Sequence, residues 1–338
     1  MTWLDQARRA IAAGEPAVLV TVVAVQGSVP REPGARLLVL RDRVVESIGG
    51  GHLEFAATAA ARLAPLRPHS ETIALGPELG QCCGGKVRLL FEPLAAGDLG
   101  WLTALGELDC AAILVRRVGP AALPLSLNPD MIASAALPAE IRQQARDFAD
   151  GAERIALVER DSGETWLFER PPPAPDRLQL FGAGHVGAAL VQALAALPFR
   201  VDWIDGRPDV FPGTLPANVR TSSAAPADAV AAARAGDFFL VMTHSHPLDL
   251  EICEKVLRRG DFAFLGLIGS ETKRARFVSR LRARGLPPDL VQRLTCPIGI
   301  PEIGGKHPAV IAIAVAAQLV ALSEQVRART RQPQGRAG

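Results

Sequence analysis

The sequence predicts an α/β protein of two domains, a mixed α/β domain followed by a doubly wound parallel sheet. Three observations support this prediction. The chain has 338 residues, enough for about two hydrophobic cores. Four prolines within residues 171–175 predict a stiff, extended linker. Strand-like runs dominate before these prolines, whereas strands alternate with helices after them.

The first predicted domain, residues 1–170, is a mixed α/β domain whose patterns do not fix a topology. Its helices are expected at residues 3–14, 53–66 and 138–149. Its strands are expected at residues 17–27, 35–42, 86–94, 110–119, 154–161 and 164–170.

The second predicted domain, residues 178–326, follows a linker at residues 171–177. Apolar strands alternate with helices along it, which is typical of a parallel sheet with helices on both faces. A long helix is expected from about residue 308, and residues 327–338 are basic and poor in apolar side chains. We therefore expect a flexible tail at residues 327–338.

The composition argues against several classes of protein. The 37 basic and 35 acidic residues nearly cancel, and the arginines look scattered, so no nucleic-acid partner is expected. The longest apolar stretch, residues 309–322, looks too short to span a bilayer, and the first helix does not resemble a signal peptide. Five cysteines do not suggest a secreted disulfide framework. We expect a soluble cytoplasmic protein with reduced thiols.

A glycine motif at the start of the second domain is the strongest local signal. Gly182, Gly184 and Gly187 have G-x-G-x-x-G spacing between a predicted strand and a predicted helix, and Asp205 ends the next strand. These glycines allow a tight turn and a close approach of pyrophosphate, while the acid suits a ribose hydroxyl. The motif predicts a Rossmann-type turn that binds NAD(P) or another dinucleotide. The alternative is a turn that is empty or reused.

Two further glycine runs precede predicted helices. Gly49, Gly50 and Gly51 lie before an alanine-rich helix, where free N–H groups would form an anion site. Lys306 follows another glycine pair and could contact an anion, although the spacing is not that of a P-loop. In both places the simpler reading is a tight turn at a helix start.

Histidines and arginines supply the other candidate ligand contacts. His244, His246 and Asp249 follow a strand of the second domain and suit either a metal or a cofactor at the carboxyl edge of the sheet. Arg31 and Arg36 lie in and beside a turn-rich loop and suit an anionic group, or else solvent.

Two adjacent cysteines, Cys82 and Cys83, precede Gly84 and Gly85. Adjacent cysteines are poor disulfide partners, and their glycine and polar neighbours argue against a purely apolar role. The glycines leave room for a bulky ligand, and Lys86 would favour a thiolate. The other cysteines are expected to pack as small apolar side chains: Cys110, Cys253 and Cys296.

In order and spacing, these motifs resemble the XdhC/CoxI family of molybdenum-cofactor maturation proteins. The resemblance runs nearly end to end, through the strings GSVPREPGARLLV, SIGGGHLE, CCGGKVRLLFEP, LFGAGHVG, WIDGRPDVFP, THSHPLDLEIC and PIGIPEIGGKHPAV. It implies a chaperone that binds the molybdenum cofactor, protects it during sulfuration and inserts it into xanthine dehydrogenase, rather than an enzyme. The implied partners are the xanthine dehydrogenase apoenzyme, a cysteine desulfurase, cofactor biosynthesis proteins and a second copy of the chain.

The resemblance also implies which residues contact the cofactor. A cysteine adjoining Gly-Gly recurs in the family, so Cys83 is expected to contact molybdenum ahead of Cys82. Gly84 and Gly85 would give the ligand room. The expected phosphate contacts are Arg31, Arg36, Gly49, Gly50 and Gly51, and the candidates in the second domain are Gly182, Gly184, Gly187, Asp205, His244, His246 and Lys306. A competing hypothesis is an NAD(P)-dependent oxidoreductase that uses the second domain.

Overall fold

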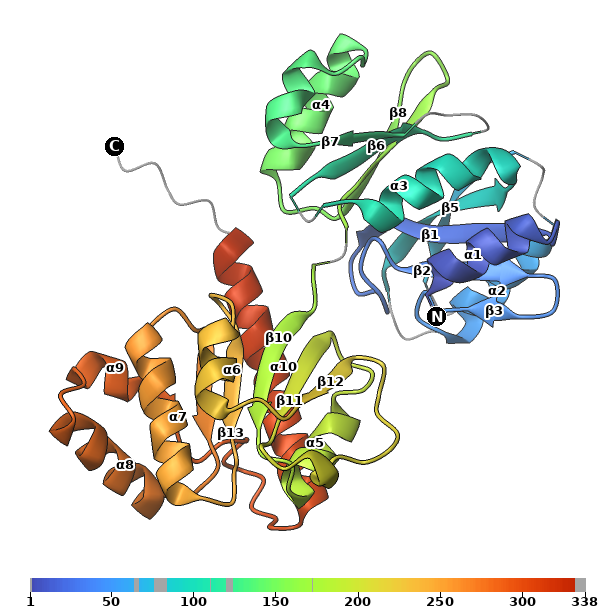
Figure 1. Ribbon diagram of the computed structural model, residues 1–338. Helices are drawn as coiled ribbons and strands as arrows, with labels where there is room; N and C mark the ends of the chain where they lie inside the picture. The colour runs from blue at the N-terminus through green and yellow to red at the C-terminus, as the bar shows by residue number, and fades with distance from the viewer. Residues whose placement is uncertain are drawn as a thin grey trace. The chain divides into compact units, whose positions relative to one another are not determined.

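The computed structural model describes residues 2–63, 67–75, 84–109, 111–119, 124–171 and 173–331. The chain divides into two compact units, Met1–Pro173 and Ala174–Gly338 (Figure 1). The division falls inside the predicted linker, but strand β10 already begins at Asp176. The extended segment is therefore shorter than the sequence suggested.

A five-stranded antiparallel sheet forms the first half of unit 1, with the strand order β3-β2-β1-β5-β4. Successive side chains of a strand point to opposite faces. Accordingly, Val20 of β1 packs with helix α2, whereas Leu19 packs with helices α1 and α3. The elements are α1 (Trp3–Ala12), β1 (Ala17–Gln26), β2 (Arg36–Leu40), β3 (Val44–Val45), α2 (Gly51–Leu63), β4 (His69–Ala74), β5 (Lys86–Leu94) and α3 (Leu99–Glu107).

A second antiparallel sheet, with the order β7-β6-β9-β8, completes unit 1. Helix α4 places Ile141, Ala145 and Phe148 on one side, and these side chains pack against Phe168 of β9. The apolar residues recur at three- to four-residue spacing, as expected for a helix with one buried face. The elements are β6 (Ile113–Arg117), β7 (Leu125–Leu127), α4 (Ala139–Asp150), β8 (Ile155–Glu159) and β9 (Thr165–Glu169).

Unit 2 is built on a six-stranded parallel sheet with the order β12-β11-β10-β13-β14-β15. Strand β10 pairs with β11 on one side and with β13 on the other, so the strand order reverses between β10 and β13. This is the doubly wound arrangement that the sequence predicted. The strands are β10 (Asp176–Phe181), β11 (Phe199–Ile204), β12 (Val219–Ser222), β13 (Phe238–Val241), β14 (Phe264–Leu267) and β15 (Leu294–Thr295).

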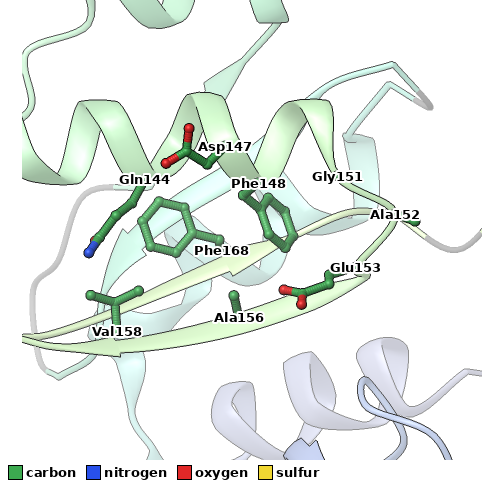
Figure 2. Close-up of a pocket in the computed structure, with 9 residues that line it drawn as sticks. All are labelled: Gln144, Asp147, Phe148, Gly151, Ala152, Glu153, Ala156, Val158 and Phe168. Atoms are coloured by element: carbon green, nitrogen blue, oxygen red, sulfur yellow. The ribbon is translucent and has the colours of Figure 1, made fainter. Parts of the chain in front are cut away.

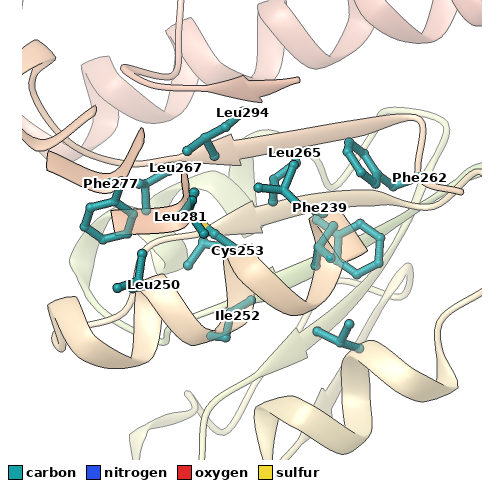
Figure 3. Packing of buried hydrophobic residues seen from close by; sticks show 14 of the residues in the cluster. Phe239, Leu250, Ile252, Cys253, Phe262, Leu265, Leu267, Phe277, Leu281 and Leu294 are labelled. Atoms are coloured by element: carbon teal, nitrogen blue, oxygen red, sulfur yellow. The ribbon is translucent and has the colours of Figure 1, made fainter. Parts of the chain in front are cut away.

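Helices cover both faces of the parallel sheet. On one face, helices α6 to α9 enclose a core that includes Phe239, Leu265 and Cys253 (Figure 3). On the other face, α5 and α10 pack over Leu180 and Trp203. The helices are α5 (His185–Ala193), α6 (Pro226–Ala232), α7 (His246–Arg259), α8 (Glu271–Ala283), α9 (Pro288–Gln292) and α10 (Pro308–Arg331).

Helix α10 differs from its prediction in two respects. It continues to Arg331, into the segment expected to be a flexible tail. In the part of the chain that is described, its residues Pro308–Ala328 are long and apolar enough to cross a membrane by length and composition alone, a longer segment than the apolar stretch 309–322 considered from the sequence. Core helices of globular proteins pass the same test. Here Val315 and Leu319 are fully buried against the sheet.

Candidate functional site

Three glycine-rich segments of unit 1 meet at one end of strands β1 and β5. A side chain on Gly85 would collide with Ser28 O at 2.4 Å and with Val29 Cγ1 at 2.9 Å. The backbone at Gly85 therefore lies directly on the loop that follows β1. Gly27, in the same loop, has a φ of +74° and a Cβ position 3.2 Å from the Cα of Gly85. Glycine is needed at both positions.

The same loop also contacts the turn that precedes helix α2. Gly49 has a φ of +123°, and a side chain there would lie 2.5 Å from the ring of Pro30. The guanidinium of Arg31 donates to the carbonyl of Ser47 at 3.3 Å, yet the Arg31 side chain remains 44% exposed. The structure thus brings together Arg31, the glycines of the turn, and the Gly84–Gly85 pair.

The turn at Gly49–Gly51 is not an empty anion site. One carboxylate oxygen of Glu54, in the first turn of α2, accepts hydrogen bonds from Ser47 Oγ at 2.6 Å, Gly50 N at 3.1 Å and Ile48 N at 3.3 Å. Gly49 N donates to Ser47 Oγ at 3.1 Å. Of the predicted phosphate cradle, the amide of Gly50 is thus taken by an internal carboxylate and that of Gly49 by a hydroxyl, so the prediction gains no support from the structure.

Arg36 is also not available as an anion contact. Its guanidinium is paired with Glu169, its side chain is only 12% exposed, and it stacks over the ring of Trp3. Burial lowers the pKa of Arg36 to about 9. Next to it, Arg116 donates to both carboxylate oxygens of Glu92, at 2.7 and 2.8 Å. This buried ionic cluster connects the two sheets of unit 1, so the prediction for Arg36 was wrong.

Cys82 and Cys83 lie outside the described residues, and their assignment stays a prediction. What the structure describes is the backbone to which they are joined. Gly84 is exposed and has nothing within 4 Å of its Cβ position. Lys86 is exposed at the start of β5 and pairs with Gln26 in the strand ladder.

In unit 2, the predicted glycine turn lies at the point where the strand order reverses. Gly182 has a φ of +109°, and a side chain there would lie 2.4 Å from Met242 O after β13. Gly187 packs its backbone against Gly182 O, with a Cβ position 2.5 Å from that oxygen. Gly184, by contrast, is exposed with open space around it. It is the N-cap residue of α5 and, as a glycine, has no side chain that could cap the helix.

Asp205 lies beside this turn, but its carboxylate is already engaged. It accepts from Ala183 N at 2.9 Å and from the Nε and Nη2 atoms of Arg207, each at 2.9 Å. The Arg207 hydrogen bonds, helped by the Ala183 amide, lower the pKa of Asp205 to about 2. A ribose hydroxyl would therefore have to share or replace Arg207.

His244 and His246 follow β13 at the same edge, and both are exposed. Asp249 does not join them as a ligand, because it is fully buried. Its carboxylate accepts from Thr243 Oγ1 and from Lys273 Nζ, each at 2.7 Å. Among the described residues, no group of three histidine, cysteine or acidic side chains could hold a metal. The metal-site alternative therefore finds no support there.

Lys306 lies in the loop between β15 and α10 and is exposed. The C-terminal part of helix α10 lies near the start of β10, because the side chains of Ser323 and Arg327 donate hydrogen bonds to the carboxylate of Asp176. The helix therefore begins at the carboxyl edge of the sheet, the edge that also holds the glycine turn. This places Lys306 near that edge, and within the described residues it forms no hydrogen bond or ion pair with the other candidates.

The cysteines of unit 2 behave as predicted. Cys253 and Cys296 are free and buried in the core beside α7 and β15. Burial raises the pKa of both thiols, which keeps them protonated and unreactive. Cys110 lies outside the described residues.

A separate cavity of about 380 Å³ opens between α4 and strands β8 and β9 (Figure 2). The rings of Phe148 and Phe168 and the carboxylates of Asp147 and Glu153 are among the groups that line it. No residue predicted from the sequence lines it, so it is not part of the candidate site.

Sequence reasoning missed three residues that shape these sites: Glu54, Arg207 and Lys273. An available signal was the position of Glu54, an acid in the first turn of a helix that follows glycines. Arg207 is two residues beyond the predicted ribose-binding acid. Lys273 gave no signal of its own, because its contact with Asp249 spans two helices.

Comparisons with known proteins bear on both units. Residues 10–71 match the XdhC and CoxI family, and residues 178–319 match the XdhC Rossmann domain. Together the two matches cover more than half of the chain. The uncharacterized protein YqeB of Escherichia coli (strain K12) is 33% identical over 149 residues, which are 43% of this chain and 27% of that protein. The chain thus spans about a quarter of the length of this curated relative.

A solved structure covers the whole fold. It is described as a xanthine dehydrogenase (BH1974) from Bacillus halodurans, and it matches with a TM-score of 0.72 and 23% identity over 99% of this chain and 98% of that chain. At this identity the match shows a shared fold. The predicted fold class is confirmed, and the two sequence matches show that the chain belongs to the XdhC and CoxI family.

Proposed function

We propose that the chain is an accessory protein that carries the molybdenum cofactor, holds it during sulfuration and inserts it into a xanthine dehydrogenase-type apoenzyme. Family membership supports a role in maturation. The observation that carries the proposal is the convergence in unit 1, where the backbone next to Cys82 and Cys83 packs on the loop that carries Arg31. The cofactor is the cargo of this protein and not a resident group.

The residues at this convergence suit the two ends of such a cargo. Molybdenum accepts soft thiolate ligands, and Cys83, with Cys82 beside it, supplies them. The terminal phosphate needs cations that are not already paired inside the protein. Lys86 is exposed, and Arg31 is 44% exposed with only a long, solvent-exposed ion pair to Glu32 at 3.8 Å, whereas Arg36 is buried against Glu169. We therefore assign the phosphate contact to Arg31 and Lys86.

Gly84 and Gly85 have different roles in this proposal. Gly85 is needed for packing, because any side chain would strike the loop after β1. Gly84 has open space on its exposed side, which leaves room for a bulky ligand next to the thiols. Delivery requires release, so the thiol contact must be one that the apoenzyme can displace.

The proposal extends to partners and location. We propose that the chain acts as a chaperone and not as an enzyme, in the cytoplasm and as a homodimer. Its partners would be the apoenzyme, a cysteine desulfurase and the proteins that make the cofactor. Family association with xanthine dehydrogenase maturation supports partners of this kind.

The test is to isolate the chain with cofactor and to measure both loading and transfer. Loading is read as pterin fluorescence after oxidation, and transfer as activation of apo-xanthine dehydrogenase. We expect Cys83→Ala to lose most of both, and Cys82→Ala to lose less. Cys253→Ala is the matched control, because it removes a thiol buried in the core of unit 2.

The cysteine assignment is wrong if both single variants and the Cys82→Ala/Cys83→Ala double variant keep wild-type loading and transfer. A loss shared by Cys253→Ala would instead indicate damage to the fold. Circular dichroism of all four variants separates these outcomes.

A second candidate function is nucleotide binding in unit 2. It is favoured by one observation, the open start of α5 at Gly184, beside the reversal of strand order. Calorimetric titration with NAD and NADP tests it, with hydride transfer measured separately. Saturable binding with turnover would support the oxidoreductase hypothesis, and binding without turnover would leave a structural or regulatory nucleotide. No binding of either would remove this candidate.

A further inference from the structure

Helix α8 carries four arginines that have no ion-pair partner within the described residues. They are Arg274, Arg276, Arg280 and Arg282, on a helix whose one acidic residue is Glu271 at its start. Three of the four are exposed and Arg274 is partly so. The arginines look scattered along the sequence as a whole, but these four lie within nine consecutive residues of one helix.

Several arginines close to α8 are paired, unlike the four on this helix. Arg258 donates to Glu254 at 2.9 Å, and Arg259 forms a pair with Asp261 at 3.0 Å. Arg284, directly after α8, is paired with Glu254. The chain carries a net charge of only +2, so an unpaired group of this size is a local feature.

The arginines are arranged around a row of small side chains. Ala275, Ser279 and Ala283 are four residues apart and all exposed, so they form one row along the outer face of α8. On a helix, the rows at i+1 and i−1 flank such a row. Arg276 and Arg280 lie on one side, and the other side is taken by Arg274 and Arg282. The opposite face of the helix is buried through Phe277 and Leu281.

We propose that this outer face of α8 docks an acidic helix of a partner protein. A row of small residues allows the axis of a second helix to approach closely. Carboxylates along both edges of that second helix would then meet a guanidinium on either side, and arginine pairs with carboxylates bidentately. Charge complementarity thus specifies the occupant.

Other occupants fit the surface less well. Single-stranded nucleic acid is bound by aromatic side chains that stack on bases, and the only aromatic residue of α8, Phe277, is buried. A membrane-surface helix needs large apolar side chains beside its basic ones, and none of the exposed large apolar residues lies on α8. This inference is independent of the proposal for the cofactor.

The proposal can be tested with a defined probe, a synthetic helical peptide whose alanine face is flanked by glutamates on both edges. Binding of the full chain is measured by fluorescence anisotropy at low ionic strength. We expect Arg276→Glu/Arg280→Glu to weaken binding at least about tenfold, because it turns two attractive contacts into repulsive ones. Arg276→Gln/Arg280→Gln should weaken it in the same direction by less.

The matched control is Arg200→Glu/Arg220→Glu, which makes the same change in net charge on exposed positions of strands β11 and β12. We expect this control to change the affinity less than about twofold. Circular dichroism verifies that every variant is folded.

Three results would overturn the proposal. The first is no saturable binding of the peptide, or equal binding of a scrambled peptide of the same composition. The second is an equal loss in the α8 variant and the control, which would indicate bulk charge alone. The third is tighter binding to duplex DNA or to phosphatidylserine vesicles than to the peptide, because the occupant would then belong to another class.

Discussion

Two of the glycine-rich turns that precede helices, one in each unit, differ in what occupies the helix start. Before α2, the carboxylate of Glu54 takes the donors of Ser47, Ile48 and Gly50. Before α5, the carboxylate of Asp205 accepts from Ala183 N, but the cap residue Gly184 is exposed and nothing lies within 4 Å of its Cβ position. A similar sequence signal therefore produced a closed turn in unit 1 and an open turn in unit 2.

The difference comes from the first turn of each helix. Helix α2 has an acid there, and a carboxylate near a helix N-terminus is attracted by the free N–H groups and the helix dipole. Helix α5 begins with His185 and has no acid in its first turn. Glycine spacing thus predicts where a turn forms, while an acid in the first turn of the helix decides whether the helix start is filled from within; Asp205, which lies outside α5, takes only Ala183 N of the glycine turn.

The largest effect is expected at Gly182, which the open turn requires for its shape. Gly182→Ala would place a Cβ 2.4 Å from Met242 O at a φ of +109°. We expect a loss of at least about 3 kcal/mol in the free energy of unfolding, measured by chemical denaturation. Gly184→Ala is the control, because its Cβ meets nothing within 4 Å. It should cost no more than about 1 kcal/mol.

The same two variants, Gly182→Ala and Gly184→Ala, also test whether the turn before α5 is open to a ligand. If the turn binds a nucleotide, Gly184→Ala should weaken that binding while the protein remains folded, because the new methyl group occupies the open space. Equal destabilisation by Gly182→Ala and Gly184→Ala would mean that the two glycines do not differ as described.

A smaller effect is expected where the turn of unit 1 is closed. Glu54→Ala leaves three donors without their acceptor and should lower the free energy of unfolding by about 2 kcal/mol. Glu54→Gln keeps one acceptor oxygen and should cost less. Glu32→Ala is the control, because Glu32 is 61% exposed and its one ion pair, with Arg31, is at 3.8 Å. Its cost should stay within about 0.5 kcal/mol, and an equal cost for Glu54→Ala would contradict the closed turn.

The smallest effect is a pH dependence that comes from Asp205. Its pKa is lowered to about 2 by the Arg207 hydrogen bonds, so the folded state favours the charged carboxylate. The resulting stabilisation, about 1 to 2 kcal/mol, is present above the ordinary pKa near 4 and is lost as the pH falls towards 2. Denaturation curves between pH 5 and 2 should show this loss in the wild type, and Asp205→Asn should reduce it. An unchanged slope in that variant would count against the ion pair.

Much of the fold was predictable, because the spacing of apolar residues and the run of prolines are local properties of the sequence. They do not depend on which elements pack together. Helix α3 was missed because Gly100 and Gly106 lower its helix propensity. Strand β4 was missed because its sequence, His69–Ala74, is largely polar, as edge strands often are. Both elements form because of contacts with their neighbours: α3 packs in a core with α1 and β1, and β4 pairs with β5.

The candidate site was predictable only in part. The sequence placed Gly182, Gly184 and Gly187 in the correct turn, because their spacing is a local property. It could not show that Arg36 faces Glu169, since the two residues are 133 positions apart in sequence. For the same reason it did not show that Asp249 faces Lys273. Long-range charge pairing decides which ionic side chains remain free for a ligand.

The most direct test of the proposed cofactor role is the amount of molybdenum cofactor that copurifies with each form of the chain. We expect nearly stoichiometric pterin in the wild type. The folded Cys82→Ala/Cys83→Ala variant should contain at least about tenfold less, because loss of metal-contacting groups commonly costs that much. Wild-type loading in that double variant, or no cofactor in the wild-type chain produced in cells that make it, would contradict a thiol-dependent carrier.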